Sequence, residues 1–138
     1  MKRLLLLMMM VLSFCCIEAQ TIRNANQSTV ATIDKDGTVR NSNNSVIGRF
    51  SSNNNIRDRN NSYIGKIESS GDIRDHNNSY LGKVESNGTV RNRNNSVLGR
   101  IGSDGTVRNS NNSVIGYAKG VPMNYAAVFF FFDLFGDN

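Results

Sequence analysis

The fold is decided by one stretch of the chain, residues 37–50, which reads GTVRNSNNSVIGRF. Two short runs of strand-forming residues, 38–41 and 46–50, flank the polar segment Ser42-Asn43-Asn44. Such runs on both sides of a three-residue polar turn are typical of a β-hairpin. The last residue of this kind of loop has a left-handed backbone, which Asn44 tolerates better than most residues do. The stretch therefore predicts one hairpin.

The same pattern recurs every 17 residues. Arginine recurs at 23, 40, 57, 74, 91 and 108, and glycine at 48, 65, 82, 99 and 116. The first copy is degenerate and has Ala31 in the glycine position. Six copies account for Ile22 to about Lys119; equally, five units span Val30 to Arg108, with Ile22-Arg23 closing against residues 114–118. Because a unit this short cannot hold a helix of normal length, we expect an all-β fold with two strands per unit.

The apolar residues indicate how successive strands meet. If all loops have three residues, with Gly88 in the left-handed position of its turn, Val84 faces Val90 and Val90 faces Leu98. Leu81 and Val84 are three apart and would point to opposite faces of a plain strand. A bulge or bend at Gly82, repeated at each equivalent glycine, would turn both inward. We therefore predict a closed ring or short barrel of antiparallel hairpins, with a β-solenoid as the alternative.

The N-terminus has the three-part order of a secretory signal peptide. Met1-Lys2-Arg3 is basic, residues 4–17 are almost entirely apolar, and Ala19 precedes the polar Gln20. We interpret residues 1–19 as a cleaved signal, which predicts export to the periplasm, the outer membrane surface or the extracellular space. Both cysteines, Cys15 and Cys16, leave with it, so we expect no disulfide and no cysteine metal site. The remaining chain has 14 Lys and Arg against 10 Asp and Glu, a net charge of +4.

The C-terminal segment, residues 120–138, differs from the repeats in residues 20–119. It carries Phe129 to Phe132 and Leu134-Phe135, an apolar run too short to cross a bilayer. We expect a short helix or strand that caps one mouth of the ring or plugs its centre. The alternative is an anchor to a membrane surface or to a second copy of the chain through Phe129, Phe130, Phe131 and Phe132.

The repeat unit and the tail together resemble the bacterial 5-fold β-flower proteins. The resemblance rests on the repeated form Gly-Thr-Val-Arg-Asn-x-Asn-Asn-Ser-Val-Ile-Gly-Arg-Ile and on the tail Ala-Ala-Val-Phe-Phe-Phe-Phe, residues 126–132. Asn44 and its equivalents depart from the family, which more often has glycine there. The resemblance implies a ring of β-hairpins, secretion in Gram-negative bacteria and no established biochemical activity.

The sequence offers little for catalysis. The single histidine, His76, occupies a turn position that holds Ser42, Arg59, Arg93 or Ser110 in other copies. The serines lie in turns, where their hydroxyl groups satisfy the local backbone. The acidic turn that starts at Asp34 opens like a calcium loop but lacks the closing glutamate. We expect a structural or interaction module of the cell envelope, without enzyme activity, cofactor or metal.

The repeated arginines are the best candidate for a binding feature. A closed ring would place Arg40, Arg57, Arg74, Arg91 and Arg108 at equal angles on one surface, with Arg49, Lys66, Lys83 and Arg100 as a second ring. Guanidinium groups suit the carboxylates and phosphates of anionic glycans or lipid headgroups. The structural interpretation is that they cover strand surface and pair with Asp58, Asp75, Glu68 and Glu85. We expect no nucleic acid partner, because Tyr63 and Tyr80 are too few for base stacking.

Overall fold

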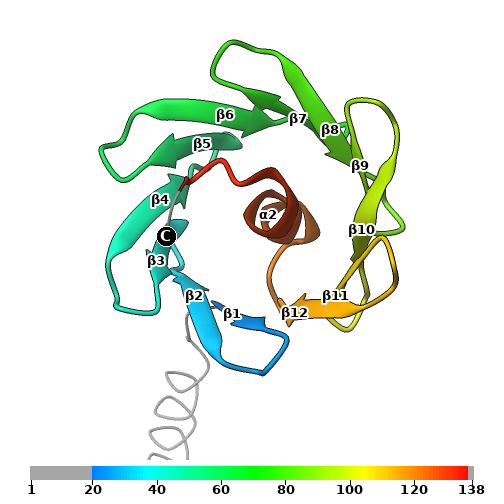
Figure 1. The fold of residues 1–138 in the computed structure, drawn as a ribbon. Helices are drawn as coiled ribbons and strands as arrows, with labels where there is room; N and C mark the ends of the chain where they lie inside the picture. The colour runs from blue at the N-terminus through cyan, green and yellow to red at the C-terminus, as the bar shows by residue number, and fades with distance from the viewer. Residues whose placement is uncertain (1–19, 137–138) are drawn as a thin grey trace, which may run out of the picture.

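The computed structural model describes residues 20–136, which form a closed ring of antiparallel strands around a short central helix (Figure 1). The predicted signal peptide, residues 1–19, lies outside the described residues. Each strand pairs with its neighbours in sequence, and β1 pairs with β12 to close the ring. The prediction of a closed ring of hairpins is therefore confirmed, and the β-solenoid alternative is wrong. The twelve strands are β1 (Gln20–Asn24), β2 (Thr29–Ile33), β3 (Thr38–Asn41), β4 (Val46–Phe50), β5 (Asn55–Asp58), β6 (Tyr63–Ile67), β7 (Asp72–Asp75), β8 (Tyr80–Val84), β9 (Thr89–Asn92), β10 (Val97–Ile101), β11 (Thr106–Asn109) and β12 (Val114–Tyr117).

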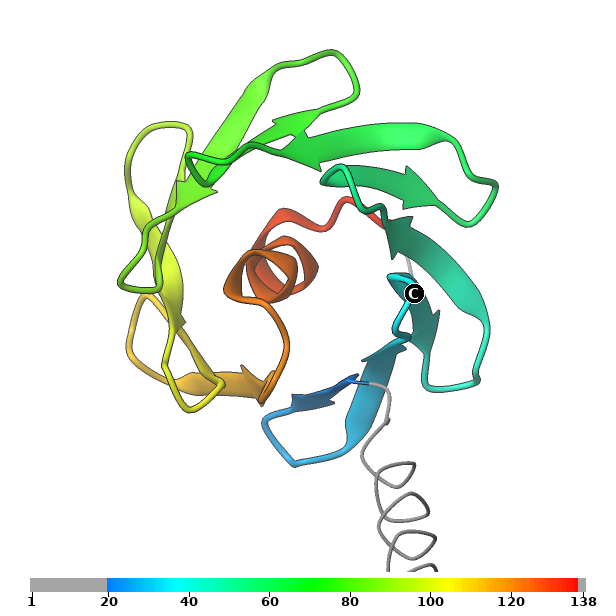
Figure 2. The ribbon, with the colours of Figure 1, turned by 180° about the vertical axis from the view of Figure 1, so that it is seen from behind.

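The described strands form six hairpins, from β1–β2 to β11–β12 (Figure 2). Arg23 lies opposite Tyr117, so the predicted closing of Ile22-Arg23 against residues 114–118 is confirmed, and the division into five units plus this closing pair describes the same ring. Three-residue loops join the strands on both sides. In the loop after β3, the N–H of Asn41 donates to the carbonyl oxygen of Ser45 at 2.9 Å, and Asn44 has φ of 67°. In the loop after β8, Gly88 takes the same place with φ of 92°. The predicted left-handed position of both loops is confirmed.

Each hairpin contains one β-bulge immediately before its glycine or, in the first copy, alanine. In the β9–β10 pair, Val97 lies opposite Arg91 while Gly99 lies opposite Val90. The prediction that Val84 faces Val90 is confirmed, whereas the prediction that Val90 faces Leu98 is wrong by one residue. Leu98 is the extra residue of the bulge, so the pairing moves on to Gly99.

The core follows the inner side of the ring. One branched aliphatic side chain of each odd-numbered strand is fully buried, and these are Ile22, Val39, Ile56, Ile73, Val90 and Val107. The last residue of β2, β4, β6, β8 and β10 is also buried. Burying such side chains stabilises the fold by about 1.5–3 kcal/mol each. All six hairpins contribute equivalent residues, so the core is shared around the ring.

The C-terminal segment fills the centre of the ring and confirms the predicted plug. Helix α2 (Met123–Ala127) continues into the π-helical turn η1 (Val128–Phe132). The buried residues Ala126, Ala127 and Val128 lie within it. None of the helices in residues 20–136 is long and apolar enough to cross a membrane.

The glycines of the even-numbered strands make room for this plug. Ideal Cβ atoms built on them would come within 2.3–3.3 Å of plug side chains. The predicted bulge at each glycine is confirmed, with the extra residue directly before the glycine. The close approach of the plug side chains is a second role of these glycines, which the sequence did not predict. Each plug side chain faces one glycine: Phe130 faces Gly116, Phe131 faces Gly99, Phe132 faces Gly82, Leu134 faces Gly65, and Phe135 faces Gly48. In the first hairpin the position belongs to Ala31, which is fully buried in the same cluster as Phe129.

Candidate functional site

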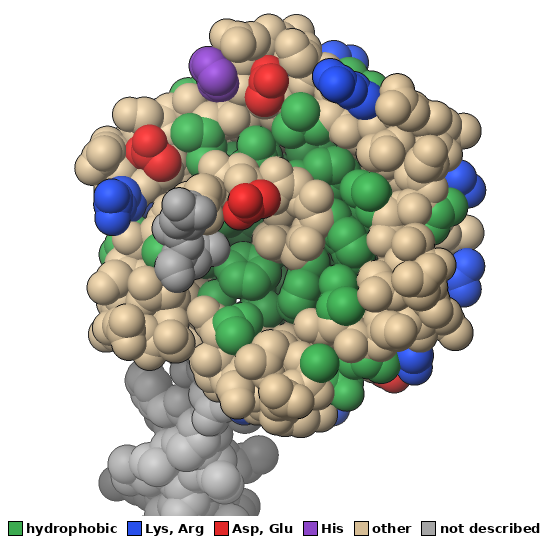
Figure 3. Space-filling view, viewed as in Figure 1, with side chains coloured by type: hydrophobic (Ala, Val, Ile, Leu, Met, Phe, Trp, Pro, Cys, Tyr) green, Lys and Arg blue, Asp and Glu red, His purple; other side chains and the backbone are tan. Residues whose placement is uncertain are grey.

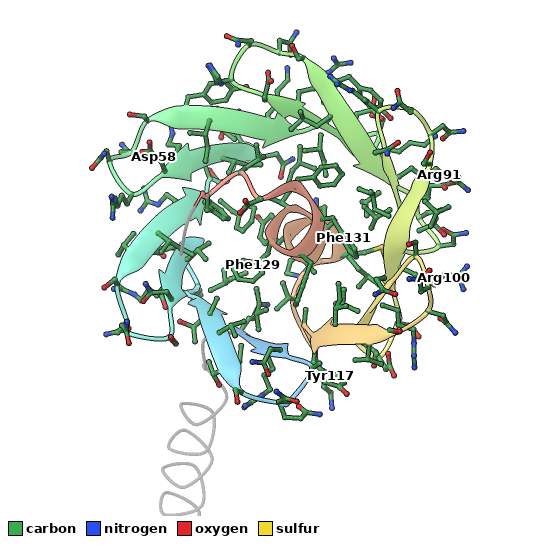
Figure 4. All side chains as sticks on the ribbon, in the orientation of Figure 1. Asp58, Arg91, Arg100, Tyr117, Phe129 and Phe131 are labelled. Atoms are coloured by element: carbon green, nitrogen blue, oxygen red, sulfur yellow. The ribbon has the colours of Figure 1, made fainter. Side chains whose placement is uncertain are left out.

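The outer wall of the ring carries the charged side chains, whereas its centre is apolar. Figure 3 shows hydrophobic side chains around the middle of one face and Lys and Arg side chains at its outer edge. Figure 4 places Arg91 and Arg100 on the outer side of the ring and Phe129 and Phe131 inside it. This follows from strand alternation, because the arginine of each odd-numbered strand comes directly after a buried aliphatic residue. The structure thus places the predicted arginine row on one continuous outer surface.

Each arginine of the row contacts the loop of its own hairpin. The Nη1 atom donates to a carbonyl oxygen four residues further along, at 3.0–3.3 Å in all six copies. Three of these arginines also donate from Nε to a carboxylate: Arg40 to Asp34, at 2.9 Å, Arg74 to Glu68, and Arg91 to Glu85. The guanidinium groups therefore hold the loops in place, a contact that was not predicted from the sequence.

The predicted acidic partners are partly corrected. Glu68 and Glu85 do pair with the row, but Asp58 and Asp75 do not serve as its partners. The Asp58 carboxylate accepts the backbone N–H groups of Asn60 and Ser62, each at 2.9 Å. Asp75 and the equivalent asparagines accept the same two bonds. These Asx turns explain why Asn or Asp occupies this position in every copy.

The second ring of cations lies directly opposite the first on neighbouring strands. The pairs are Arg49 with Arg57, Lys66 with Arg74, Lys83 with Arg91, and Arg100 with Arg108. Like charges directly opposite each other destabilise a sheet, unless a counter-charge lies nearby. Two of these pairs have a glutamate as counter-charge, Glu68 beside Arg74 and Glu85 beside Arg91. In a third pair, Asp36 lies 3.6 Å from Arg49. Within residues 20–136, no carboxylate lies within 4.0 Å of Arg100 or Arg108.

Local hydrogen bonds keep several carboxylates of the wall ionised. The side-chain bond from Arg91 holds the pKa of Glu85 below its usual value. The backbone N–H of Thr38 lowers the pKa of Asp36, and that of Thr106 lowers the pKa of Asp104. Burial raises the pKa of Tyr80, whose ring lies 5.7 Å from the Arg74 guanidinium carbon. The lowered pKa values extend the ionised range of these three carboxylates toward acid pH.

The residues considered for catalysis are not brought together. His76 is exposed in the loop after β7, and Ser79 in the same loop donates its backbone N–H to Asp75. In the part of the chain that the structure describes, no three His, Cys, Asp or Glu side chains gather in a group that could hold a metal ion.

A family model described as 5-fold beta-flower protein matches residues 19–134. The chain belongs to this family. No curated protein and no solved structure matches it. In this beta-flower ring, five hairpins carry glycine and face the plug, and a sixth with Ala31 completes the circle. The family name counts five, and the present chain has six hairpins in its described residues. The sequence signal for the sixth was the Arg23 copy of the repeat.

Proposed function

We propose that this beta-flower protein is an exported, non-enzymatic interaction module of the cell envelope. The observation that carries the proposal is the filled centre of the ring: Phe130, Phe131, Phe132, Leu134 and Phe135 each occupy the space in front of one glycine. The ring therefore presents its outer wall and loops, rather than a lumen, to other molecules. The family is not known as an enzyme family, which supports the same conclusion. Export rests on the signal-like residues 1–19.

The opposed cations of the wall favour a second, more specific function, the binding of anionic glycan or lipid headgroups. We call the strand pair that joins one hairpin to the next a seam. At four adjacent seams, β4–β5, β6–β7, β8–β9 and β10–β11, two cations lie opposite each other. A polyanion lying across these seams would place an anionic group in direct contact with Arg100 and Arg108, which have no carboxylate within 4.0 Å among the described residues. Carboxylate, sulfate and phosphate groups all suit guanidinium donors.

The test is retention on immobilised heparin compared with vesicles containing anionic phospholipid, both at increasing salt. The useful variant is Arg49→Gln with Arg100→Gln, because both side chains are exposed and neither donates to a loop carbonyl in the way that the row arginines do. The matched control is Arg59→Gln with Arg93→Gln, which removes the same charge from exposed loop positions.

We expect the wall variant to elute at clearly lower salt than the loop variant, since surface charge interactions are screened by salt. Preference for heparin assigns a glycan, and preference for the vesicles assigns a lipid surface. Equal elution of both variants, or no retention at all, would contradict anion binding by the wall. Mass spectrometry of the exported protein tests the signal, with a first residue of Gln20 as the expected result. Oligomerisation through Phe129, Phe130, Phe131 and Phe132 stays a prediction, now of half-buried side chains that pack against the hairpins.

A further inference from the structure

The seam where β12 meets β1 departs from the other seams of the ring. Only two residue pairs join the strands, Arg23 with Tyr117 and Asn24 with Gly116. The equivalent seam between β4 and β5 has a third pair, Phe50 with Ile56. The side chain of Gln20 bridges the shortened end by donating from Nε2 to the carbonyl oxygen of Gly120 at 2.7 Å. The closing seam therefore leaves part of β1 without a strand partner on this side.

The charge arrangement of this seam is inverted. At three other seams, the Nε of the row arginine donates to a carboxylate directly after the neighbouring strand. That carboxylate comes two residues after the residue that lies directly opposite the arginine. These carboxylates belong to Asp34, Glu68 and Glu85. At the closing seam the same place, two residues after Tyr117, belongs to Lys119, which is exposed. Arg23 thus has a lysine where three of its equivalents have their counter-ion.

An aromatic ring also replaces a cation here. Tyr117 lies opposite Arg23, in the position that Arg49, Lys66, Lys83 and Arg100 take at other seams. Figure 4 shows Tyr117 on the outer side of the ring, next to the first hairpin. Its neighbour Ala118 is buried, so the tyrosine belongs to the outer wall.

These residues line one cavity of about 460 Å³. Arg23, Lys119 and Tyr117 share it with Thr21, Gln27 and Asp104. The Asp104 carboxylate accepts the backbone N–H of Thr106 at 3.0 Å, and two cations against this one carboxylate leave the cavity positive. The volume lies within the range of about 300–1,000 Å³ that small-molecule sites occupy.

We infer that this cavity binds a monosaccharide unit that carries a carboxylate. The ligand carboxylate would take the place of the missing Asp or Glu between Arg23 and Lys119, as a charge-assisted hydrogen-bonded pair. The apolar face of the sugar ring fits against Tyr117, and its hydroxyl groups find partners in the Gln27 amide, the Thr21 hydroxyl and the Asp104 carboxylate. The inference rests on the proposed glycan binding for the class of ligand, but it uses residues that the wall test leaves untouched.

The experiment is calorimetric titration of the full chain at low salt with three probes: glucuronate, glucose, and inorganic phosphate. Glucose has the ring without the carboxylate, and phosphate has the charge without the ring. We expect glucuronate to bind at least tenfold more tightly than glucose and at least fivefold more tightly than phosphate. Glucuronate binding no tighter than that of glucose would overturn the inference.

Two variants test the residues. Lys119→Glu rebuilds the Arg–Glu pair of the other seams, so we expect an unchanged or higher melting temperature and at least tenfold weaker glucuronate binding. The control Lys35→Glu makes the same charge change on an exposed loop residue outside this cavity and should leave binding unchanged. Equal effects of the two variants would overturn the site. Tyr117→Lys introduces the cation of the other seams and should weaken glucuronate at least fivefold without weakening phosphate; if glucuronate is unaffected, the assignment of a sugar is overturned.

The two proposals fail separately. In one outcome, the Arg49→Gln, Arg100→Gln variant loses heparin retention but the parent chain does not bind glucuronate. This would overturn the proposed cavity site and support anion binding by the outer wall. In the other outcome, heparin does not retain the chain, but glucuronate binds and Lys119→Glu weakens that binding. This would support the cavity site and overturn anion binding by the outer wall.

Discussion

The match between one plug side chain and one glycine can be tested by Gly99→Ala. An ideal Cβ at this position lies 2.6 Å from Cζ of Phe131 and 2.2 Å from the carbonyl oxygen of Arg108. Carbon atoms in ordinary contact are about 3.5–4.0 Å apart, so the phenyl ring of Phe131 must move by about 1 Å. The backbone of β11 at Arg108 must also shift. The backbone of Gly99 itself has no left-handed conformation, so the whole effect comes from space.

The expected loss of stability follows from two opposing contributions. Overpacking of a filled core costs about 1–3 kcal/mol, and two simultaneous clashes place Gly99→Ala at the upper end. Replacing glycine gains about 0.4–1 kcal/mol through the unfolded state. The net loss of about 2–3 kcal/mol corresponds to a melting temperature lower by about 8–12 °C for a domain of this size. Thermal unfolding followed by circular dichroism measures it.

A double-mutant cycle shows whether the clash is with Phe131. Phe131→Ala alone costs about 2 kcal/mol, because the ring is half-buried. Combined with Gly99→Ala, it removes the clash with the ring but not the clash with the Arg108 carbonyl. The losses in free energy of unfolding of the two single variants should therefore sum to at least about 1 kcal/mol more than the loss in the double variant.

The control pairs Phe131→Ala with Gly48→Ala, which faces Phe135 on the opposite side of the ring. These two changes share no contact, so their effects should add within about 0.5 kcal/mol. Equal coupling in both cycles, or a melting temperature unaffected by Gly99→Ala, would refute the reasoning that each glycine accommodates one plug side chain.

Two further predictions concern the loops and the charged wall. Asn44→Ala should lower the free energy of unfolding by about 1 kcal/mol, because alanine tolerates a φ of 67° poorly, whereas Asn44→Gly should change it by less than about 0.5 kcal/mol; urea denaturation measures both. A larger loss for glycine than for alanine would contradict the turn assignment. Stability should also fall in acid, because the pKa of Glu85 is lower in the folded chain than its ordinary value of 4.5. The stabilisation from ionised Glu85 is fully present above pH 4.5 and is lost as the pH falls through the pKa of the folded chain. Glu85→Gln should therefore make the melting temperature depend less on pH between 6 and 3. If the variant and the parent chain show the same pH profile in this range, the Arg91–Glu85 bond is refuted.

Much of the fold could be predicted because the hairpin is a local structure. The period of 17 residues, the two strands per unit and the left-handed position of Asn44 all depend on residues within one repeat. The closed ring also followed, since regular bulges curve a sheet and closure removes exposed edges. The pairing of Val90 was wrong by one residue because the position of a bulge depends on packing across strands rather than on the run of apolar residues.

The candidate site was only partly predictable. The arginine row was visible as a repeated residue, but the acceptors of its guanidinium groups were not. Asp58 and Asp75 were expected to pair with the row, yet the nearest backbone N–H groups of their own loops bind them first. The cavity of the closing seam has no signal in any single repeat, because Arg23 and Lys119 come from opposite ends of the chain.

The sequence by itself determined the building unit: a short hairpin with Asn or Gly at its turns and an outward-facing arginine. Hydrogen bonds and backbone preferences inside one repeat are enough to specify it. Only the tertiary structure decided which residue forms each bulge, that the phenylalanines lie in front of the glycines, and that a lysine replaces a carboxylate where the ends meet. These features depend on contacts between residues far apart in the chain, and such contacts exist only once the ring has closed around its plug.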